Sequence, residues 1–380
     1  MLEDRLELTI DVTDGDAALG LTRLELSDAN GHRVELLDGL LAEVRRRIAA
    51  IYGGWVPPLG KDREANTTLA MMRGGNPKPT SILAPTEPTP EEVAQLETTS
   101  PAPAAVGAVR VGQVDTTLTD WTATAPGLMA WQGHARFVRD IVEATAPGVV
   151  VETESALKAP DGTGTTWDVA TAIAKLAAAG VDILLLPLAC FTTDGQIPLL
   201  LERAIAAVPE STLVIAAAGN QTLDPGWSAL GRGPTSPAWP AAHPRVKAVG
   251  GNPPDLEPLA ASVPIPPWLD AITTKIDFVG KFFTADVMVG EPTELDIPHA
   301  DKDDAENKDK GEEDKPVVKF KGSAKWRGTS FCAAHAAGLV AARMLAEPGR
   351  SAIDAWDALL SDESSLQRPP VTELSCLPSR

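Results

Sequence analysis

The feature that most constrains the fold is an alternation of apolar strand-like runs with helix-like stretches through the middle of the chain. Parallel neighbouring strands need crossover helices, so this order predicts an α/β fold: a doubly wound, mostly parallel sheet with helices on both faces. Periodicity places the helices where apolar residues recur at helical spacing, one of them stopping at Gly180. The predicted strands are 108–115, 149–152, 181–186 and 212–220, with one more inside 240–251, and the predicted helices start at 134, 167 and 197.

The first 60 residues have a different pattern, typical of a small α+β module. Residues 6–12 alternate apolar and polar side chains as a half-buried strand does. A second apolar-polar stretch, 19–26, leads through a turn at 28–31 to residues 32–36, which are predicted as its partner strand. A helix follows, with apolar positions between residues 40 and 51. We find no catalytic constellation within 1–60, so a regulatory, targeting or propeptide-like role is what remains for this module.

The rest of the chain is divided by composition. Residues 61–107 are rich in proline and threonine and predict a largely irregular linker, because such a stretch buries little apolar surface. Residues 108–380 hold the predicted sheet. Within them, the stretch near 296–316 is dominated by Asp, Glu and Lys and predicts a solvated, mobile acidic insertion.

Charge and cysteine usage exclude several classes of function. The 52 acidic and 33 basic residues give a net charge of −19, which argues against nucleic acid or an anionic membrane as the main partner. Three widely spaced cysteines imply no disulfide framework, and no Cys/His spacing suggests a metal site or another cofactor. A structural calcium ion is conceivable near the acidic insertion but no ligand spacing indicates one. Since neither a secretory leader nor a bilayer-length apolar run is evident, we expect a cytoplasmic protein.

A Gly-Thr-Ser sequence at 328–330 precedes a long run of small and apolar residues. Glycine permits a tight turn, and the start of a helix offers free N–H groups and a positive dipole end beside the serine oxygen. One interpretation is therefore that Ser330 is a nucleophile at the N-terminus of a buried helix. The other is that the motif only caps that helix.

Three further residues lie where sites form in such sheets. Asp115 ends a predicted buried strand, although an aspartate there also commonly starts a turn. His134 begins a helix and is the one histidine of five in the predicted sheet region at such a boundary, although a lone helix-start histidine is usually structural. Asn220 ends another strand. Together with Ser330 they supply the orienting carboxylate, general base, nucleophile and oxyanion donor that acyl transfer needs.

These four residues, in this order, resemble the subtilisin-like serine proteases. Their contexts are Val-Asp-Thr, Gly-His-x-x-Phe-Val, Ala-Ala-Ala-Gly-Asn and Gly-Thr-Ser-x-x-Ala-x-His, and the segment 240–250 is similar too. The resemblance covers residue 108 to the C-terminus. It implies a serine endopeptidase acting on polypeptides, with a catalytic triad of Asp115, His134 and Ser330 and with Asn220 in the oxyanion hole. It also implies that Leu188, Ala189, Cys190 and Gly219 line the substrate cleft.

The chain departs from that family around the implied site. Ala135 and Arg136 follow the histidine where the family has Gly-Thr, and Thr117 stands where the family has a glycine. The segment Pro187-Leu188-Ala189-Cys190 replaces Ser-Leu-Gly-Gly. The side chains that this last change adds should narrow the pocket in which the backbone of an extended substrate pairs. These changes motivate an alternative, a catalytically weak or inactive scaffold that binds peptides or a protein partner. The N-terminal module is a candidate site for a regulatory partner under either hypothesis.

Overall fold

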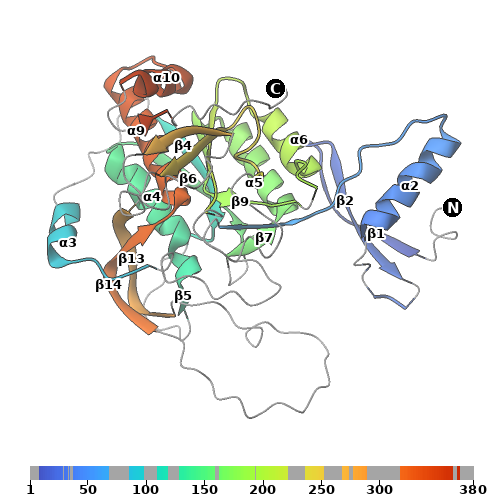
Figure 1. Cartoon of the computed structure of the whole chain (residues 1–380), viewed down its shortest axis with the longest axis horizontal. Coiled ribbons are helices and arrows are strands. Elements are labelled where there is room, and N and C mark those ends of the chain that lie inside the picture. Colours follow the sequence, from blue (N-terminus) through green and yellow to red (C-terminus); the bar gives the residue numbers. More distant parts are fainter. Residues whose placement is uncertain are drawn as a thin grey trace, which may run out of the picture.

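The computed structural model describes most of the chain, and every structural statement below concerns these residues: 8–28, 30–32, 34, 37–67, 85–97, 109–118, 128–158, 162–192, 194–220, 236–251, 268–273, 277–288, 317–362 and 366–368. A large α/β body occupies most of the molecule (Figure 1). The N-terminal strands and α2 project from one side of it, and α3 lies at the opposite side.

The body is built on a seven-stranded sheet in the order β15-β12-β11-β10-β8-β4-β6. Six of its strands are parallel, and only β15 runs antiparallel to its neighbour. The predicted doubly wound, mostly parallel sheet is therefore confirmed. The strand bounds are β4 Arg110–Thr116, β6 Val150–Leu157, β8 Ile183–Leu186, β10 Leu213–Ala217, β11 Lys247–Gly251, β12 Leu269–Thr273 and β15 Leu366–Gln367.

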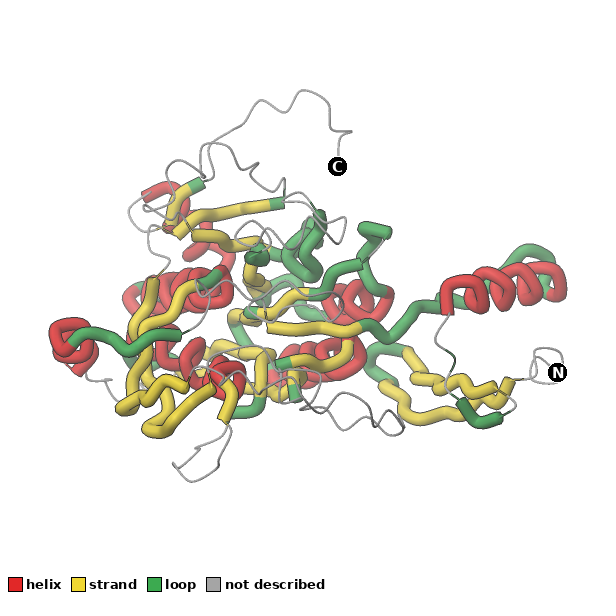
Figure 2. Tube along the Cα trace, turned by 60° about the horizontal axis from the view of Figure 1, so that its bottom comes forward, coloured by secondary structure: helices red, strands yellow, loops and turns green. Residues whose placement is uncertain are grey.

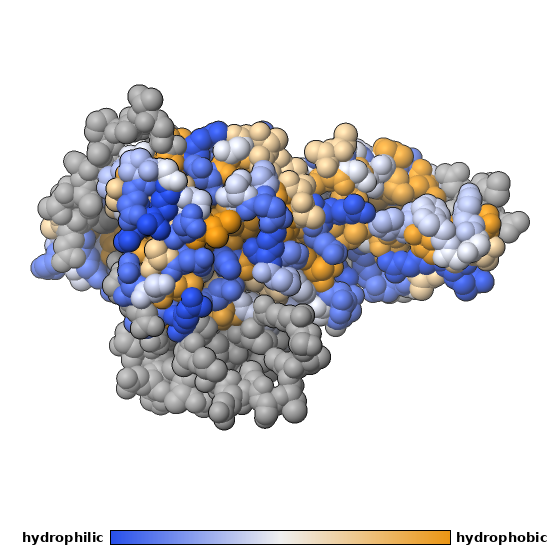
Figure 3. Space-filling view, turned by 90° about the horizontal axis from the view of Figure 1, so that it is seen from above, coloured by the Kyte–Doolittle hydropathy of each residue, from blue (hydrophilic) through white to orange (hydrophobic). Residues whose placement is uncertain are grey.

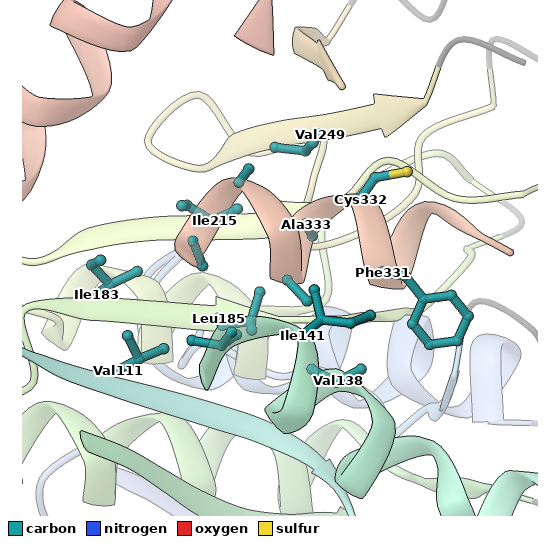
Figure 4. Close-up of a cluster of buried hydrophobic side chains, with 14 of the residues drawn as sticks. Val111, Val138, Ile141, Ile183, Leu185, Ile215, Val249, Phe331, Cys332 and Ala333 are labelled. Carbon is teal, nitrogen blue, oxygen red and sulfur yellow. The ribbon is translucent and has the colours of Figure 1, made fainter. Parts of the chain in front are cut away.

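Helices cover both faces of this sheet, because its strands are apolar on both sides. Alternate residues of β8 show the division: Ile183 and Leu185 join one core with α4 and α9, while Leu184 and Leu186 join the other with α5 and α6. Figure 4 shows the first core, where strand residues meet Val138 of α4 and Ala333 of α9. The helix bounds are α4 His134–Thr145, α5 Thr166–Ala179, α6 Leu199–Ala207, α9 Thr329–Ala346 and α10 Ala352–Asp362.

Helix α9 runs through the centre of the first core. Eleven of its 18 residues are buried, among them the whole run from Thr329 to Ala334. Its length and composition would also allow it to cross a membrane, but 61% of it is buried inside the fold. The apolar surface of α9 is thus already used by the sheet and by α4, as a helix that is hydrophobic all round requires.

A long antiparallel hairpin packs beside the sheet and was not predicted. It consists of β13 Asp277–Met288 and β14 Val317–Arg327, and the short strand β5 Leu128–Met129 joins its outer edge. The buried residues Phe320, Ala324 and Trp326 alternate with lysines along β14. That alternation was the available signal in the sequence. The acidic insertion predicted near 296–316 lies outside the described residues.

The N-terminal module contains an antiparallel hairpin, β1 Leu8–Asp16 with β2 Leu21–Asp28, followed by α2 Leu37–Ile51. The predicted partner strand at 32–36 is not a regular strand at its described residues, His32 and Val34. They still bond to the end of β2, because the backbone N–H of Val34 donates to the carbonyl of Leu26 at 3.0 Å and that of Asp28 donates to the carbonyl of His32 at 2.8 Å. Along its length β2 pairs with β1. No residue of α2 is buried. Apolar atoms accordingly gather on the surface of this module, at the right of Figure 3.

The stretch 61–107, predicted as a largely irregular linker, contains two ordered elements. Strand β3 Glu64–Thr67 lies between β7 Thr163–Thr165 and β9 Leu188–Ala189 in a three-stranded antiparallel sheet. Helix α3 Pro90–Glu97 lies against the β13–β14 hairpin at the left of Figure 2. Propensity alone could not have found β3, since its four residues form a strand only by pairing with two distant ones.

Candidate active site

The site lies where the strand order reverses. From β4 the chain passes through α4 on one face to β6, and from β8 it passes through α6 on the other face to β10. The neighbouring strands β4 and β8 therefore send their connections to opposite faces of the sheet. Ligands bind outside the carboxyl ends of such strands. Asp115 lies at the end of β4, and Pro187 follows β8 directly.

Asp115 and His134 form a buried pair at this point. Oδ1 of Asp115 is 2.6 Å from Nδ1 of His134, and both side chains are completely buried. The aspartate is held from its own strand, because its Oδ1 accepts a hydrogen bond from the backbone N–H of Thr116 and its Oδ2 accepts one from Nε2 of Gln113. A carboxylate fixed in this way sets the tautomer and the orientation of the imidazole.

Two side chains of β4 also connect the strand to the start of α4. Nε2 of Gln113 donates to the carbonyl of Ala135 at 3.0 Å, and Oγ1 of Thr116 accepts from the backbone N–H of Ala135 at 3.1 Å. His134 is the first residue of α4, so these bonds fix its backbone relative to Asp115. Sequence reasoning gave Gln113 no role. The sequence did contain a sign of this role, because Gln113 is a long amide side chain within an otherwise apolar strand. Such a side chain must find hydrogen bonds when it is buried.

Ser330 lies in the first turn of α9, after Gly328, whose φ of 152° is one that glycine adopts readily. The serine is completely buried, and its Oγ donates a hydrogen bond to the carbonyl of Pro187 at 3.0 Å. Nε2 of His134 is buried and has no hydrogen-bond partner among the described residues. The structure thus joins Asp115 to His134 and Ser330 to the end of β8, but it does not contain the serine–histidine bond that the triad requires.

Asn220 connects the end of β10 to the start of the same helix. Its Oδ1 accepts the backbone N–H of Thr329 at 3.1 Å, and Oγ1 of Thr329 accepts the backbone N–H of Gly219 at 3.2 Å. In this orientation the amide hydrogens of Asn220 face away from Thr329, since oxygen and nitrogen occupy opposite arms of the amide. The predicted oxyanion residue is therefore beside the serine, while its role as a donor stays a prediction.

The predicted substrate-binding residues are occupied by the protein itself. Asn66 and Thr67 of β3 pair with Ala189 and Leu188 of β9. Cys190 exchanges two backbone hydrogen bonds with Trp239, at 2.7 and 2.9 Å. Leu188, Ala189 and Cys190 are completely buried as a result, and that Gly219 or these residues bind substrate stays a prediction.

Aromatic rings enclose the imidazole. The ring centroid of His134 is 5.4 Å from that of Phe331 and 5.9 Å from that of Trp326, the latter nearly perpendicular at 86°. Phe137 packs on both of these rings, at 4.8 and 5.5 Å. Sequence reasoning named neither Trp326 nor Phe137 as part of a site. Phe331 is the residue after Ser330, so its contact with His134 places the start of α9 beside the imidazole.

No family model matches this chain, and no curated protein matches it. Among solved structures, it is similar to the prenylagaramide maturation protease PagA, with 17% identity, a TM-score of 0.43, and coverage of 72% of this chain and 88% of that one. It is likewise similar to a lanthipeptide protease, with 17% identity, a TM-score of 0.43, and coverage of 67% and 79%. At this identity and TM-score the likeness assigns no activity or substrate to this chain.

Within the described residues, no group of three or more His, Cys, Asp or Glu side chains is placed to hold a metal ion. The acidic stretch near 296–316, where the sequence made a calcium ion conceivable, lies outside those residues. The structure therefore does not test a calcium site there. What the described site offers is acid–base and nucleophilic chemistry: one imidazole, one carboxylate, one hydroxyl, and the backbone N–H of Ser330 in the first turn of α9.

Proposed function

We propose that the protein is a serine endopeptidase in which Ser330 is the nucleophile, His134 the general base and Asp115 the residue that orients it. One observation carries the proposal: a fully buried carboxylate–imidazole pair, 2.6 Å apart, lies at the topological switch point beside the start of the helix that bears the serine. A buried imidazole held by a carboxylate is suited to accept a proton from a hydroxyl and to pass it to a leaving amine.

For the reaction, the hydroxyl of Ser330 must leave the carbonyl of Pro187 and bond to Nε2 of His134, and the proposal requires that another staggered rotamer of Ser330 makes that bond. Nε2 takes the hydroxyl proton as Oγ attacks the substrate carbonyl, and Asp115 supports the charge on the imidazole. The protonated imidazole then gives that proton to the amine that leaves. Water, activated in the same way, hydrolyses the acyl-enzyme and restores the serine.

The developing oxyanion needs donors, and in this proposal one of them is the backbone N–H of Ser330 in the first turn of α9. The neighbouring N–H groups of Phe331 and Cys332 already donate to the carbonyl of Gly328. Asn220 contributes a side-chain donor in this proposal. Because its Oδ1 is bound to Thr329, the amide is held in one orientation with its N–H groups on the opposite side. A donor held in advance need not be reorganised when charge develops, which is why such groups are effective.

A second candidate function is supported by a specific observation. All three reacting groups are completely buried, and β3 already pairs with the edge of β9 that an extended peptide would use. A peptide could bind there only after β3 had left, because one strand edge accepts one partner. In a catalytically inactive scaffold β3 would stay in place, and the protein would bind its partners elsewhere.

Labelling with a fluorophosphonate, mapped by mass spectrometry, separates the two functions. We expect label on Ser330, faster labelling in Asn66→Pro, which removes a backbone donor of β3, and no label in Ser330→Ala. Val12→Pro, in the remote hairpin, is the matched control and should label as the unmodified chain does. If neither the unmodified chain nor Asn66→Pro is labelled while both are folded, the hydrolase proposal fails and the scaffold is favoured.

A further inference from the structure

Part of the predicted linker is attached to the strand that leads into the serine helix. Residues 85–97 are here called the strap. Near its start, the backbone N–H and carbonyl of Thr86 both pair with Lys325 of β14 at 2.8 Å. One residue later, Glu87 forms an ion pair with Lys321 of the same strand at 3.3 Å. The strap therefore adds a short antiparallel bridge to β14 three residues before Gly328.

The helix of the strap reinforces this attachment through one carboxylate. Glu92 and Thr89 form a reciprocal cap at the start of α3: the backbone N–H of Thr89 donates to Oε2 of Glu92, and the backbone N–H of Glu92 donates to Oγ1 of Thr89. The other oxygen of Glu92 accepts a hydrogen bond from Nζ of Lys325 at 2.8 Å. This bond, followed by the one from Thr89, lowers the pKa of Glu92.

Lys325 and Trp326 are consecutive, so in a strand their side chains point to opposite faces. The lysine side chain meets the strap, and the tryptophan points into the core, where it is 1% exposed. There its ring contacts His134, and it lies 5.1 Å from the ring of Phe331. Any shift of β14 at Lys325 is thus carried directly to the ring that packs on the imidazole.

We propose that Trp326 is a positioning residue for His134, and that the strap sets its position by clamping Lys325. Asp115 holds the imidazole only at Nδ1, and a single hydrogen bond leaves the ring free to tilt. Trp326 and Phe331 limit that tilt from two sides. The result is that Nε2 keeps a constant direction relative to the start of α9. A catalytic role for this positioning of His134 rests on the proposed function, but the positioning itself can be measured without any enzymatic activity.

The test is the proton resonance of the Asp115–His134 hydrogen bond, recorded by NMR on the full chain with ¹⁵N-labelled histidine. We expect Trp326→Ala to lose this resonance through faster exchange with solvent, because the imidazole is no longer held, and Trp326→Phe to retain it. Trp356→Ala is the matched control: Trp356 is an equally buried tryptophan of the same core, in α10. It should lower the melting temperature and leave the resonance unchanged.

The strap is tested by Glu92→Gln, Lys325→Met and the double variant. Each single variant should broaden the same resonance, and the double variant should broaden it no more than either single one, because both act through one contact. Glu154→Gln, which breaks the exposed pair with Lys175 on another part of the surface, should leave it unchanged. These milder variants keep the proposal testable if Trp326→Ala fails to fold.

Two results would overturn the proposal. One is an unchanged resonance in a folded Trp326→Ala whose melting temperature falls as in Trp356→Ala, which would make Trp326 a core residue only. The other is an unchanged resonance in both strap variants, which would disconnect the strap from His134. Absence of fluorophosphonate labelling of Ser330 would count against the proposed function alone, since the NMR measurement concerns only the Asp115–His134 bond.

Discussion

The N-terminal module and the body around the seven-stranded sheet have similar amphipathic sequence patterns, but they bury their apolar side chains to very different extents. In the sheet body, α9 buries eleven residues and the strands contribute apolar side chains to cores on both faces. In the module, α2 buries none. Of the seven exposed large hydrophobic residues in the described chain, five belong to the module: Val12, Leu24, Ile51, Tyr52 and Trp55. An amphipathic pattern therefore predicts an element, but its stability comes from the partner that covers it.

The module is held to the body mainly by polar contacts. Oδ2 of Asp14 accepts a hydrogen bond from the indole N–H of Trp167 at 3.0 Å, and Arg23 forms an ion pair with Asp62 at 2.7 Å. Among the described residues of the module, Leu19, in the turn between β1 and β2, is buried in the second core, and the half-buried Leu21 packs against that core. The two regions thus differ in how much apolar surface they bury: apolar packing stabilises the body, whereas the module is attached by a few polar bonds and by Leu19.

The comparison is sharpest for large-to-small substitutions. Leu185→Ala, at a completely buried position of β8, should lower the free energy of unfolding by about 2–5 kcal/mol, because it removes buried methyl groups and leaves a cavity. Val12→Ala, at a position 70% exposed on β1, should change it by less than about 0.5 kcal/mol. Urea titration of both variants measures this. A comparable loss in Val12→Ala would mean that the module is covered in solution.

Adding one methyl group should change the stability of the protein in opposite directions in the two regions. In α9, a Cβ on Gly338 would lie 2.6 Å from Cβ of Thr145, so Gly338→Ala should cost about 1–3 kcal/mol through overpacking against α4. In α2, a Cβ on Gly39 would meet nothing within 4 Å, so Gly39→Ala should stabilise the helix by about 0.5–1 kcal/mol. Thermal unfolding should show one melting temperature falling and the other unchanged or higher.

Attachment of the module should depend on single polar bonds. Asp14→Ala leaves the indole N–H of Trp167 unpaired where it is buried, and we expect a cost of about 1 kcal/mol, seen as faster limited proteolysis around the module. Asp11→Ala, at an exposed position of the same strand, is the control and should be cut at the rate of the unmodified chain. Equal rates in all three proteins would show that other contacts hold the module.

The smallest expected effect is a pH dependence confined to the module. Hydrogen bonds from Arg46 and then Arg47 lower the pKa of Glu43 in α2 from 4.5 to about 2. Since the folded-state pKa is the lower one, the stabilisation is present above pH 4.5 and is lost as the pH falls toward 2. The protection of α2 amides against hydrogen exchange, taken relative to their intrinsic rates at each pH, should therefore fall over that interval, and Glu43→Gln should remove this dependence. The exchange of α9 serves as the internal reference.

Much of the body could be predicted because its signals are local. The apolar run before Asp115 and the helical spacing after His134 each identify an element from its own residues, and Gly180 ends α5 in the left-handed conformation as expected. The hairpin β13–β14 was missed although β14 alternates, because its two strands are far apart in the sequence and pair only in the folded chain. The cytoplasmic location, the division into domains and a partner for the module stay predictions.

By itself, the sequence determined which elements form and which residues stand at their ends, because periodicity and turn chemistry act over a few neighbouring residues. It therefore placed Asp115 at a strand end, His134 at a helix start and Ser330 in the first turn of a helix. Only the tertiary structure decided that β3 pairs with β9, that Ser330 bonds to Pro187, and that the strap clamps β14. These contacts join residues more than a hundred positions apart, and their partners are chosen by the packing of the whole chain, which no local pattern records.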